Sequence, residues 1–311
     1  MNIKPLIKPI LNNFPFFYDI LGFGTKGSNS ARYCYSVWLR HLVRAHEAGF
    51  DVPKVLAELG PGDSLGVGLS AMLSGTQRYY ALDIKAYAAT EKNLEIFDEL
   101  VEYFKNKIDI PHDGEFPNVY PKLHSYNFPG EIITDEILAR TLCAERLEAI
   151  RGLIKNNGEN KGLEFSYQAP WHDKKNIKKN SVDMIAAQAV MEHVDDVPAA
   201  YEALFQWLKN GGVFSQDIDF KSHNTTWNWN GYYSVSDQLW RIIRGKREWG
   251  INRIAPGEHI KSIEKVGFEI ISKEVKRLEG GIGRDKLTER FKNISDEDLA
   301  IGQMYLLARK V

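Results

Sequence analysis

The sequence predicts an α/β protein with a doubly wound, mostly parallel sheet of seven strands. Short apolar segments alternate with stretches of helical periodicity along most of the chain. The strand predicted at 54–59 runs directly into the glycine-rich turn 60–66. A helix at 67–73 and a strand at 78–82 follow, and this order is a βαβ unit with parallel strands. The same alternation resumes near residue 163.

The first 50 residues are predicted to form an N-terminal helical cap, and residues 51–311 the main domain. Residues 1–50 are rich in aromatic side chains, and their apolar residues recur at helical spacing over 30–48. Gly49 is a typical stop signal for this helix.

Residues 90–156 form an excursion after the second strand that is too long for an ordinary crossover. A helix is predicted from Thr90, a proline-rich and glycine-rich loop over 110–130, and a second helix over 134–154. Long excursions of this kind often carry function, so the segment is expected to be a helical lid over a substrate site.

The rest of the chain supplies the other five strands. They are predicted at 163–168, 182–187, 213–217, 268–272 and 303–308, with helices at 197–208 and 257–266.

Composition excludes several classes of protein. The formal net charge is −1 and 26% of residues are charged, so no strong positive field favours nucleic acid. The basic run Lys174–Lys179 has no interleaved aromatic residues and is predicted to be a solvated loop. No apolar run approaches 18 residues, and lysines and prolines interrupt the first ten residues, so neither a membrane span nor a signal peptide is expected. A cytoplasmic location follows as an expectation.

The two cysteines, Cys34 and Cys143, support neither a disulfide framework nor a zinc site. Both lie in apolar patterns and are expected to be small core residues.

The glycine-rich turn departs from the dinucleotide fingerprint. The pattern G-x-G-x-x-G would need glycine at 60, 62 and 65, but position 65 is leucine. A nicotinamide-dependent oxidoreductase is therefore an alternative rather than the first choice. What remains is Glu58, Gly60 and Gly62, followed by Asp83 at the end of the next strand.

Here the sequence resembles the class I S-adenosylmethionine-dependent methyltransferases. Their first motif matches Glu58-Leu-Gly60-Pro-Gly62-Asp-Ser64, with Ser64 where a third glycine is usual, and Asp83 matches their second acidic position. The stretches 181–194 and 208–214 resemble two later motifs. The resemblance implies a Rossmann-like sheet with an antiparallel last strand and S-adenosyl-L-methionine as cofactor.

The resemblance also implies a set of cofactor-binding residues: Glu58, Gly60, Pro61, Gly62, Asp83, Ile84, Ala169, Trp171, Gln188 and Ala189. The glycines let the backbone approach a ligand closely. Asp83 could accept both ribose hydroxyl protons, and its alternative role is a turn cap. Glu58 could orient the turn or meet the cofactor's amino group, or it could simply brace the backbone. Trp171 could equally be packed in the core or in a lid.

Methyl transfer depends on positioning and solvent exclusion, and a hydroxyl acceptor also needs a general base. His193 follows the fourth predicted main strand, and Asp217, Asp219 and His223 follow the fifth. His193, Asp217 and His223 are the candidate catalytic residues. Asp217, Asp219 and His223 also suit a divalent cation or the capping of a loop, and no metal ligand is assigned.

The acceptor is expected to be a small polar molecule. The aromatic residues Trp227, Trp229, Tyr232, Tyr233 and Trp240, interleaved with asparagines, suit a sugar, although a lid packed on itself explains them equally. The layout is loosely similar to methyltransferases of bacterial polysaccharide or glycan biosynthesis. A non-catalytic cofactor-binding or scaffold protein is a further alternative. The sequence leaves open whether the chain forms a homo-oligomer.

Overall fold

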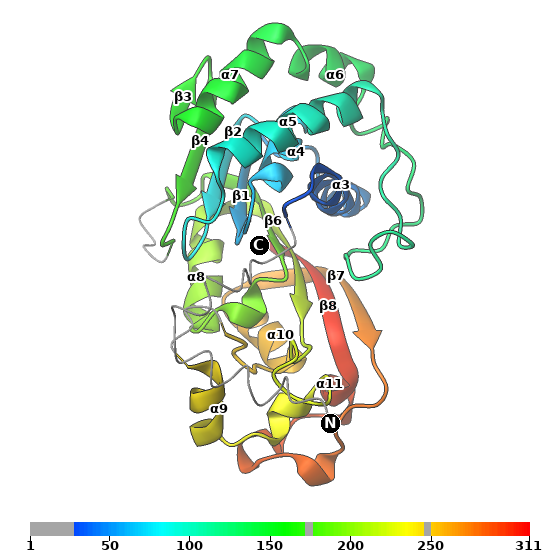
Figure 1. The fold of residues 1–311 in the computed structure, drawn as a ribbon, viewed down its shortest axis with the longest axis vertical. Helices are drawn as coiled ribbons and strands as arrows, with labels where there is room; N and C mark the ends of the chain where they lie inside the picture. The colour runs from blue at the N-terminus through cyan, green and yellow to red at the C-terminus, as the bar shows by residue number, and fades with distance from the viewer. Residues whose placement is uncertain (1–27, 172–176, 246–249) are drawn as a thin grey trace.

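An eight-stranded sheet organises the computed structural model, which describes residues 28–171, 177–245 and 250–311 (Figure 1). The strands are β1 (Val55–Leu59), β2 (Arg78–Leu82), β3 (Gly158–Asn160), β4 (Leu163–Gln168), β5 (Val182–Gln188), β6 (Leu208–Asp219), β7 (Phe268–Arg277) and β8 (Ile301–Lys310). Their order across the sheet is β3-β4-β2-β1-β5-β6-β8-β7.

The strand directions confirm the predicted fold class. The pairs β4–β2, β2–β1, β1–β5 and β5–β6 are parallel, whereas β8 pairs antiparallel with both β6 and β7. The seven predicted strands are all present. The short strand β3, antiparallel to β4, is an eighth that the sequence pattern missed because its three residues are largely exposed and carry no apolar alternation.

Helices cover both faces of the sheet. They are α3 (Ala31–Glu47), α4 (Gly66–Ser74), α5 (Thr90–Lys105), α6 (Asp135–Thr141), α7 (Ala144–Lys155), α8 (Val197–Trp207), α9 (Asp237–Arg244), α10 (Pro256–Lys265) and α11 (Asp296–Ala300), with 3-10 turns η2 (Met191–His193), η3 (Gly231–Ser234), η4 (Arg284–Lys286) and η5 (Glu289–Phe291).

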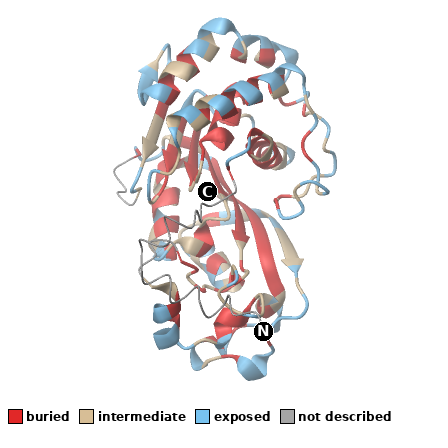
Figure 2. Ribbon diagram, in the orientation of Figure 1, coloured by how far each residue is buried: buried red, intermediate tan, exposed pale blue. Residues whose placement is uncertain are grey.

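The core consists of two layers separated by the sheet. Apolar residues of α3, α4, α5 and α7 share one buried cluster with Leu56 and Met184. Those of α8 and α10 share another with Ala57 and Ile185. Neighbouring strand residues enter opposite clusters because successive side chains point to opposite faces. Figure 2 shows the central strands buried along most of their length.

The predicted N-terminal cap is described only from residue 28 onward, so its first 27 residues lie outside the described part, as do residues 174–176 of the predicted basic loop. Its helix α3 begins at the cap residue Ser30, whose side chain accepts a hydrogen bond from the backbone of Tyr33. The helix is not a separate layer. It packs into the same buried cluster as α4 and α5.

The excursion over 90–156 contains three helices rather than two. The predicted helix over 134–154 is broken between α6 and α7, because Cys143 has an extended backbone and precedes α7 as its cap. Cys143 is therefore exposed, contrary to expectation, whereas Cys34 is buried. Both α5 and α7 pack on the sheet. The role of the segment as a lid stays a prediction.

The predicted loop over 110–130 is held in place by one buried cation. Arg40 on α3 is fully buried, and its guanidinium donates to the carbonyl oxygens of Pro111 at 2.9 Å and Val119 at 3.0 Å. It also pairs with Asp113 at 2.9 Å. Three backbone and carboxylate acceptors satisfy a charge that would otherwise be costly to bury. The loop is thus fixed against α3.

A third buried cluster lies beyond the end of β6 and includes η3, η5, α9 and α11. The sequence did not predict α9. Arg253 is buried there, with its guanidinium carbon 4.9 Å from the ring centre of Trp240 and 5.1 Å from that of Phe291. Among the described residues, every helix is too short or too polar to cross a bilayer.

Candidate active site

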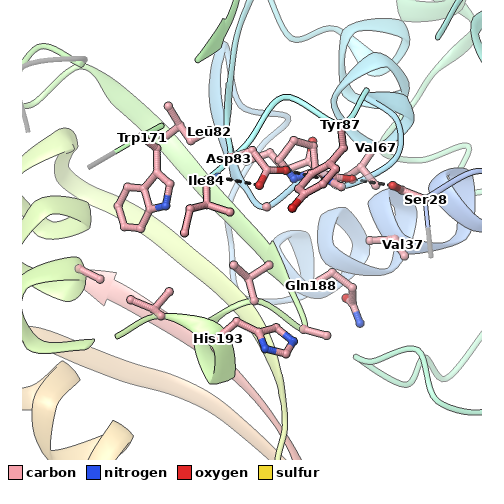
Figure 3. A pocket seen from close by; sticks show the side chains of 18 of the residues that line it. Ser28, Val37, Val67, Leu82, Asp83, Ile84, Tyr87, Trp171, Gln188 and His193 are labelled. Atoms are coloured by element: carbon pink, nitrogen blue, oxygen red, sulfur yellow. Dashed lines mark hydrogen bonds between the residues drawn. The ribbon is translucent and has the colours of Figure 1, made fainter. Parts of the chain in front are cut away.

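A pocket of about 700 Å³ opens where β1, β2 and β5 end (Figure 3). The chain leaves β1 toward β2 on one side and later returns to β5 on the other, so the carboxyl end of β1 is the point where the strand order reverses. Ligands of open α/β sheets bind in the crevice at such a point. The pocket is therefore at the position expected for the principal site of this fold.

The turn after β1 forms one wall of the pocket. Gly60 and Gly62 both have positive φ, at 61° and 74°, which favours glycine. The amide of Gly60 donates to the carbonyl oxygen of Leu82 at 2.7 Å. A Cβ atom on Gly60 would lie 2.6 Å from a methyl carbon of Val190. The turn is thus a cradle that a side chain at position 60 would fill.

Asp83 follows β2 and is bonded to the same turn. Its Oδ2 accepts a hydrogen bond from the amide of Gly62 at 3.1 Å, and its Oδ1 accepts one from the amide of Ile84 at 2.7 Å. Burial raises the pKa of this carboxyl, of which 6% is exposed. Each carboxylate oxygen can accept a further bond. Asp83 can therefore brace the turn and still accept two hydroxyl protons from a ligand.

Glu58, on β1, lies at the inner end of the pocket and is 5% exposed. The hydroxyl of Tyr79 donates a hydrogen bond to its carboxylate. Burial raises the pKa of Glu58 to about 8, although the bond from Tyr79 acts in the opposite direction. A cationic ligand group beside Glu58 would favour its ionised form.

The end of β5 presents Gln188 and Ala189 to the pocket. The side-chain Nε2 of Gln188 donates to Asp217 at 2.7 Å, and its Oε1 lies 3.0 Å from His41 Nε2. Ala189 has a positive φ of 54°, and its amide donates to the carbonyl oxygen of Asp217 at 2.9 Å. The turn is thus fixed by side-chain and backbone bonds.

Two histidines line the outer part of the pocket. His193 in η2 and His223 after β6 lie with their ring centres 5.4 Å apart. His223 Nε2 is 3.3 Å from Asp219 Oδ2, and Lys221 Nζ is 2.9 Å from the same oxygen. Burial alone would raise the pKa of Asp219, but His223 and Lys221 hold it below its usual value. The described residues contain no group of three or more side chains arranged to hold a metal ion.

Comparison with known protein families indicates the function of the domain that contains part of this pocket. A family model described as a methyltransferase domain matches residues 133–215, which include β4, β5 and the pocket residues at the end of β5. The chain carries a methyltransferase domain, and its activity is that of an S-adenosylmethionine-dependent methyltransferase. No match to the chain is found among the curated proteins.

The methyltransferase is also similar to solved structures of low sequence identity. A methyltransferase from Methanosarcina mazei is 13% identical with a TM-score of 0.43, and the match covers 86% of this chain and 97% of that chain. One from Mesorhizobium loti is 14% identical with a TM-score of 0.42, and the match covers 87% and 98% of the two chains.

The site fits S-adenosylmethionine, the methyl donor of this family. Gly60 and Gly62 line the pocket with backbone and carry no side chain, and Asp83 keeps acceptor capacity for a ribose. The nicotinamide and non-catalytic alternatives are set aside with the family assignment.

The structure brings most of the predicted site residues together. The pocket is lined by Glu58, Gly60, Pro61, Gly62, Asp83, Ile84, Trp171, Gln188, Ala189, His193 and His223. Ala169 is exposed and does not line it. Asp217 does not line it either. Only 1% of Asp217 is exposed, and it accepts hydrogen bonds from Gln188 and Gln303 instead.

Sequence reasoning missed one whole wall of the pocket. Ser28, Tyr33 and Val37 come from the start of α3 and the residues just before it. Tyr33 and Val37 are spaced four residues apart, and this signal indicated a core-facing helix stripe rather than a pocket wall. A second missed set lies at the start of α8: Asp195, Asp196, Ala199, Ala200 and Ala203.

Of the two interpretations of the aromatic cluster, three of its five members follow the one in which the segment packs on itself. Tyr232, Tyr233 and Trp240 are buried in the third core cluster, where they pack on one another. Trp229 donates its indole N–H to the carbonyl oxygen of Glu279 at 3.1 Å. Trp227 is 67% exposed. The aromatic residues are concentrated here because they form a small core.

Proposed function

We propose that the methyltransferase binds its cofactor along the full length of this pocket. Asp83 accepts the two ribose hydroxyl protons, while Ile84 and Trp171 contact the adenine. Glu58 and the turn at Gln188 contact the methionine part. The support is the spatial order of these residues around one cavity, with the glycine cradle between them. When bound, the cofactor supplies a methyl group on a sulfonium sulfur.

The acceptor in this proposal is the hydroxyl oxygen of a small polar molecule. The observation that carries it is the His223–Asp219 pair at the pocket wall. Lys221 and the bond from His223 hold the pKa of Asp219 below its usual value, so the Asp219 carboxylate accepts the N–H at His223 Nε2. The other ring nitrogen, Nδ1, then carries a lone pair. An imidazole oriented by a carboxylate is the usual form of a general base.

Groups of this chain can take up the proton that the acceptor hydroxyl loses. The bound cofactor would supply the methyl group to the acceptor oxygen, and His223 Nδ1 would take the proton that the acceptor hydroxyl loses. Asp219 stabilises the imidazolium until the proton leaves to solvent. His193, whose ring packs edge-on against His223, lies where it can orient the acceptor. Such a base contributes about 10²–10⁴-fold to the rate.

A sugar hydroxyl remains the first acceptor class to test. The buried aromatic cluster no longer supports it, because those rings face the core. Its support is now chemical: a sugar is neutral and polar and presents hydroxyl groups that need a base. A role in polysaccharide or glycan biosynthesis depends entirely on the acceptor being a sugar. The proposed glycan partner depends on the same point.

The first experiment is calorimetric binding of S-adenosylhomocysteine to the native protein and to Asp83→Ala. Native binding in the micromolar range and its loss in the variant are expected. Thermal unfolding of both proteins separates a lost contact from a lost fold. Equal binding by Asp83→Ala would remove Asp83 from the site, and no binding by the native protein would overturn the cofactor assignment.

The second experiment measures S-adenosylhomocysteine production with a panel of neutral monosaccharides, small phenols and small amines at pH 7 and pH 9. Turnover of a hydroxyl acceptor that His223→Asn lowers by at least about 100-fold is expected. Turnover restricted to amines, unaffected by that substitution, would overturn the hydroxyl proposal and leave the cofactor site intact.

A further inference from the structure

Ser64 occupies the position where the first motif usually has its third glycine, and it is fully buried. Its backbone does not need glycine, since Ser64 is not among the residues with positive φ. The Ser64 hydroxyl also makes a specific contact. It donates a hydrogen bond to the backbone carbonyl oxygen of Ser28, a residue 36 positions earlier that lines the pocket.

The two serines bond reciprocally. The amide of Ser64 donates to the hydroxyl oxygen of Ser28 at 3.1 Å. The same Ser28 hydroxyl donates to the carbonyl oxygen of Pro61 at 2.6 Å. Three hydrogen bonds therefore join the residue before α3 to the turn that forms the cofactor cradle. Buried bonds of this kind are costly to break because the groups left behind cannot reach water.

This junction fixes one wall of the pocket relative to another. Only Asn29 and the cap residue Ser30 separate Ser28 from α3, which carries Tyr33 and Val37 into the pocket. The turn joined to Ser28 carries Gly60 and Gly62. Cys34 on α3 also contacts the carbonyl oxygen of Ser28 through its Sγ at 3.4 Å. A further polar tie between α3 and the pocket joins His41 to Gln188, two helical turns away from Tyr33.

We propose that the Ser28–Ser64 pair is a positioning device for the cofactor site, and that Ser64 performs it better than the usual glycine would. The inference rests on the proposed cofactor site. Without the pair, the segment at Ser28 and the glycine turn are held less firmly relative to each other before ligand binds, so part of the binding free energy is spent on fixing them. Restoring glycine at position 64 therefore weakens binding.

The test is calorimetric binding of S-adenosylhomocysteine to Ser64→Gly and Ser64→Ala. Both variants lose the bond to Ser28, the bond that the Ser64 hydroxyl accepts from the amide of Gly66 at 3.3 Å, and its contact with Cys34 Sγ at 3.6 Å. A rise in Kd of about tenfold, equivalent to about 1.4 kcal/mol, is expected for both. The matched control is Ser70→Ala. Ser70 is equally buried, lies on α4 outside the pocket, and donates to the carbonyl oxygen of Gly66 at 2.8 Å.

A purely structural role of Ser64 would lower the melting temperature and leave the Kd unchanged, as expected for Ser70→Ala. Two further readouts separate the possibilities. Hydrogen exchange at the first turn of α3 should increase in Ser64→Gly without ligand and return to the native rate with ligand. In a double-mutant cycle, Ser28→Ala should add little to the Kd effect of Ser64→Ala.

Native-like or tighter binding by Ser64→Gly overturns the positioning role. Full additivity in the cycle does so as well, because independent effects mean that the serines do not act as a pair. Neither outcome touches the cofactor assignment. That assignment fails only if the native protein does not bind S-adenosylhomocysteine.

Discussion

His41 Nε2 lies 3.0 Å from Gln188 Oε1, which joins a helix of the N-terminal segment to the end of β5. Gln188 donates its Nε2 to Asp217, so its oxygen must face His41, and His41 must carry its proton on Nε2. His41 Nδ1 then accepts from the Ser215 hydroxyl at 2.6 Å. Burial lowers the pKa of His41 to about 4, which keeps this imidazole neutral at physiological pH.

The substitution His41→Leu should weaken cofactor binding and the fold together. It leaves the partly buried Gln188 oxygen without its donor and takes one of two partners from the Ser215 hydroxyl, which keeps Tyr305, so the free energy of unfolding should fall by about 1–3 kcal/mol. The Kd for S-adenosylhomocysteine should rise several-fold, because the Gln188 turn loses its orientation. Urea unfolding and calorimetry measure the two effects. Thr76→Val, which removes a buried hydroxyl bond to Pro53 far from the pocket, is the control.

The same variant should change the dependence of stability on pH. The folded pKa of His41 is about 4 and the ordinary value is 6.5, so only the unfolded state takes up this proton between the two. Stability therefore falls as pH drops from 6.5 to 4. His41→Leu should show a shallower fall over that window. Identical slopes for the two proteins would contradict the buried neutral state of His41.

The substitution Gly60→Ala should lower the free energy of unfolding by more than the strain of the positive φ alone explains. Position 60 combines a positive φ of 61° with a Cβ position only 2.6 Å from Val190. Gly162→Ala is a matched control, because Gly162 has a φ of 78° and nothing within 4 Å of its Cβ position. The control should cost about 1 kcal/mol, as typical for a side chain in this backbone region.

Gly60→Ala should cost clearly more than this control and should abolish binding of S-adenosylhomocysteine. Val190→Ala in the same chain should recover part of the lost stability by removing the clashing methyl carbons. Urea unfolding can be compared directly at the two positions. Equal losses in the free energy of unfolding at positions 60 and 162 would show that Val190 moves aside and that the glycine turn is not tightly packed.

Binding of S-adenosylhomocysteine should release protons near pH 7. Burial raises the pKa of Glu58 to about 8, so most Glu58 carboxyls are protonated before binding. The ligand's ammonium group beside Glu58 favours the carboxylate and lowers that pKa. Affinity should therefore increase as pH rises from 6 to 8.

Calorimetry in buffers of different ionisation enthalpy measures this proton release. Its value should lie between zero and one proton per ligand and should vanish in Glu58→Gln. Proton uptake, or the same release from Glu58→Gln, would place the titrating group elsewhere.

The substitution His223→Asn should lower kcat by about 10²–10⁴-fold for a hydroxyl acceptor and leave the Kd for S-adenosylhomocysteine unchanged. His223 pairs with Asp219 at the pocket wall, away from the glycine turn and Asp83. His193→Asn, by contrast, should raise the KM of the acceptor more than it lowers kcat.

Much of the fold was predictable because it depends on local patterns. The βαβ unit from β1 to β2 is encoded by an apolar run, a glycine turn and a second apolar run, and all three lie within 30 residues. The break at Cys143 and the strand β3 were not predictable. Helical periodicity continues across the first, and the second has no apolar residues to mark it.

Some residues of the candidate site were likewise predictable from the sequence, and others were not. Gly60, Gly62 and Asp83 follow strand ends, and parallel strands bring their carboxyl ends to one edge, so the sequence places these residues together. Asp217 follows the same logic but lies beneath the pocket, bonded to Gln188 and Gln303. Which side of a strand end faces the ligand depends on the register with neighbouring strands.

The sequence by itself determined the sheet, the glycine cradle and the acidic residue beside it, because strand, turn and helix signals act between near neighbours. Only the tertiary structure decided that α3 walls the pocket, that Ser28 meets Ser64 and that His41 meets Gln188. It also decided that the aromatic cluster at Tyr232 is core. These contacts join residues 33 or more positions apart or depend on burial, and no periodicity within one segment encodes either.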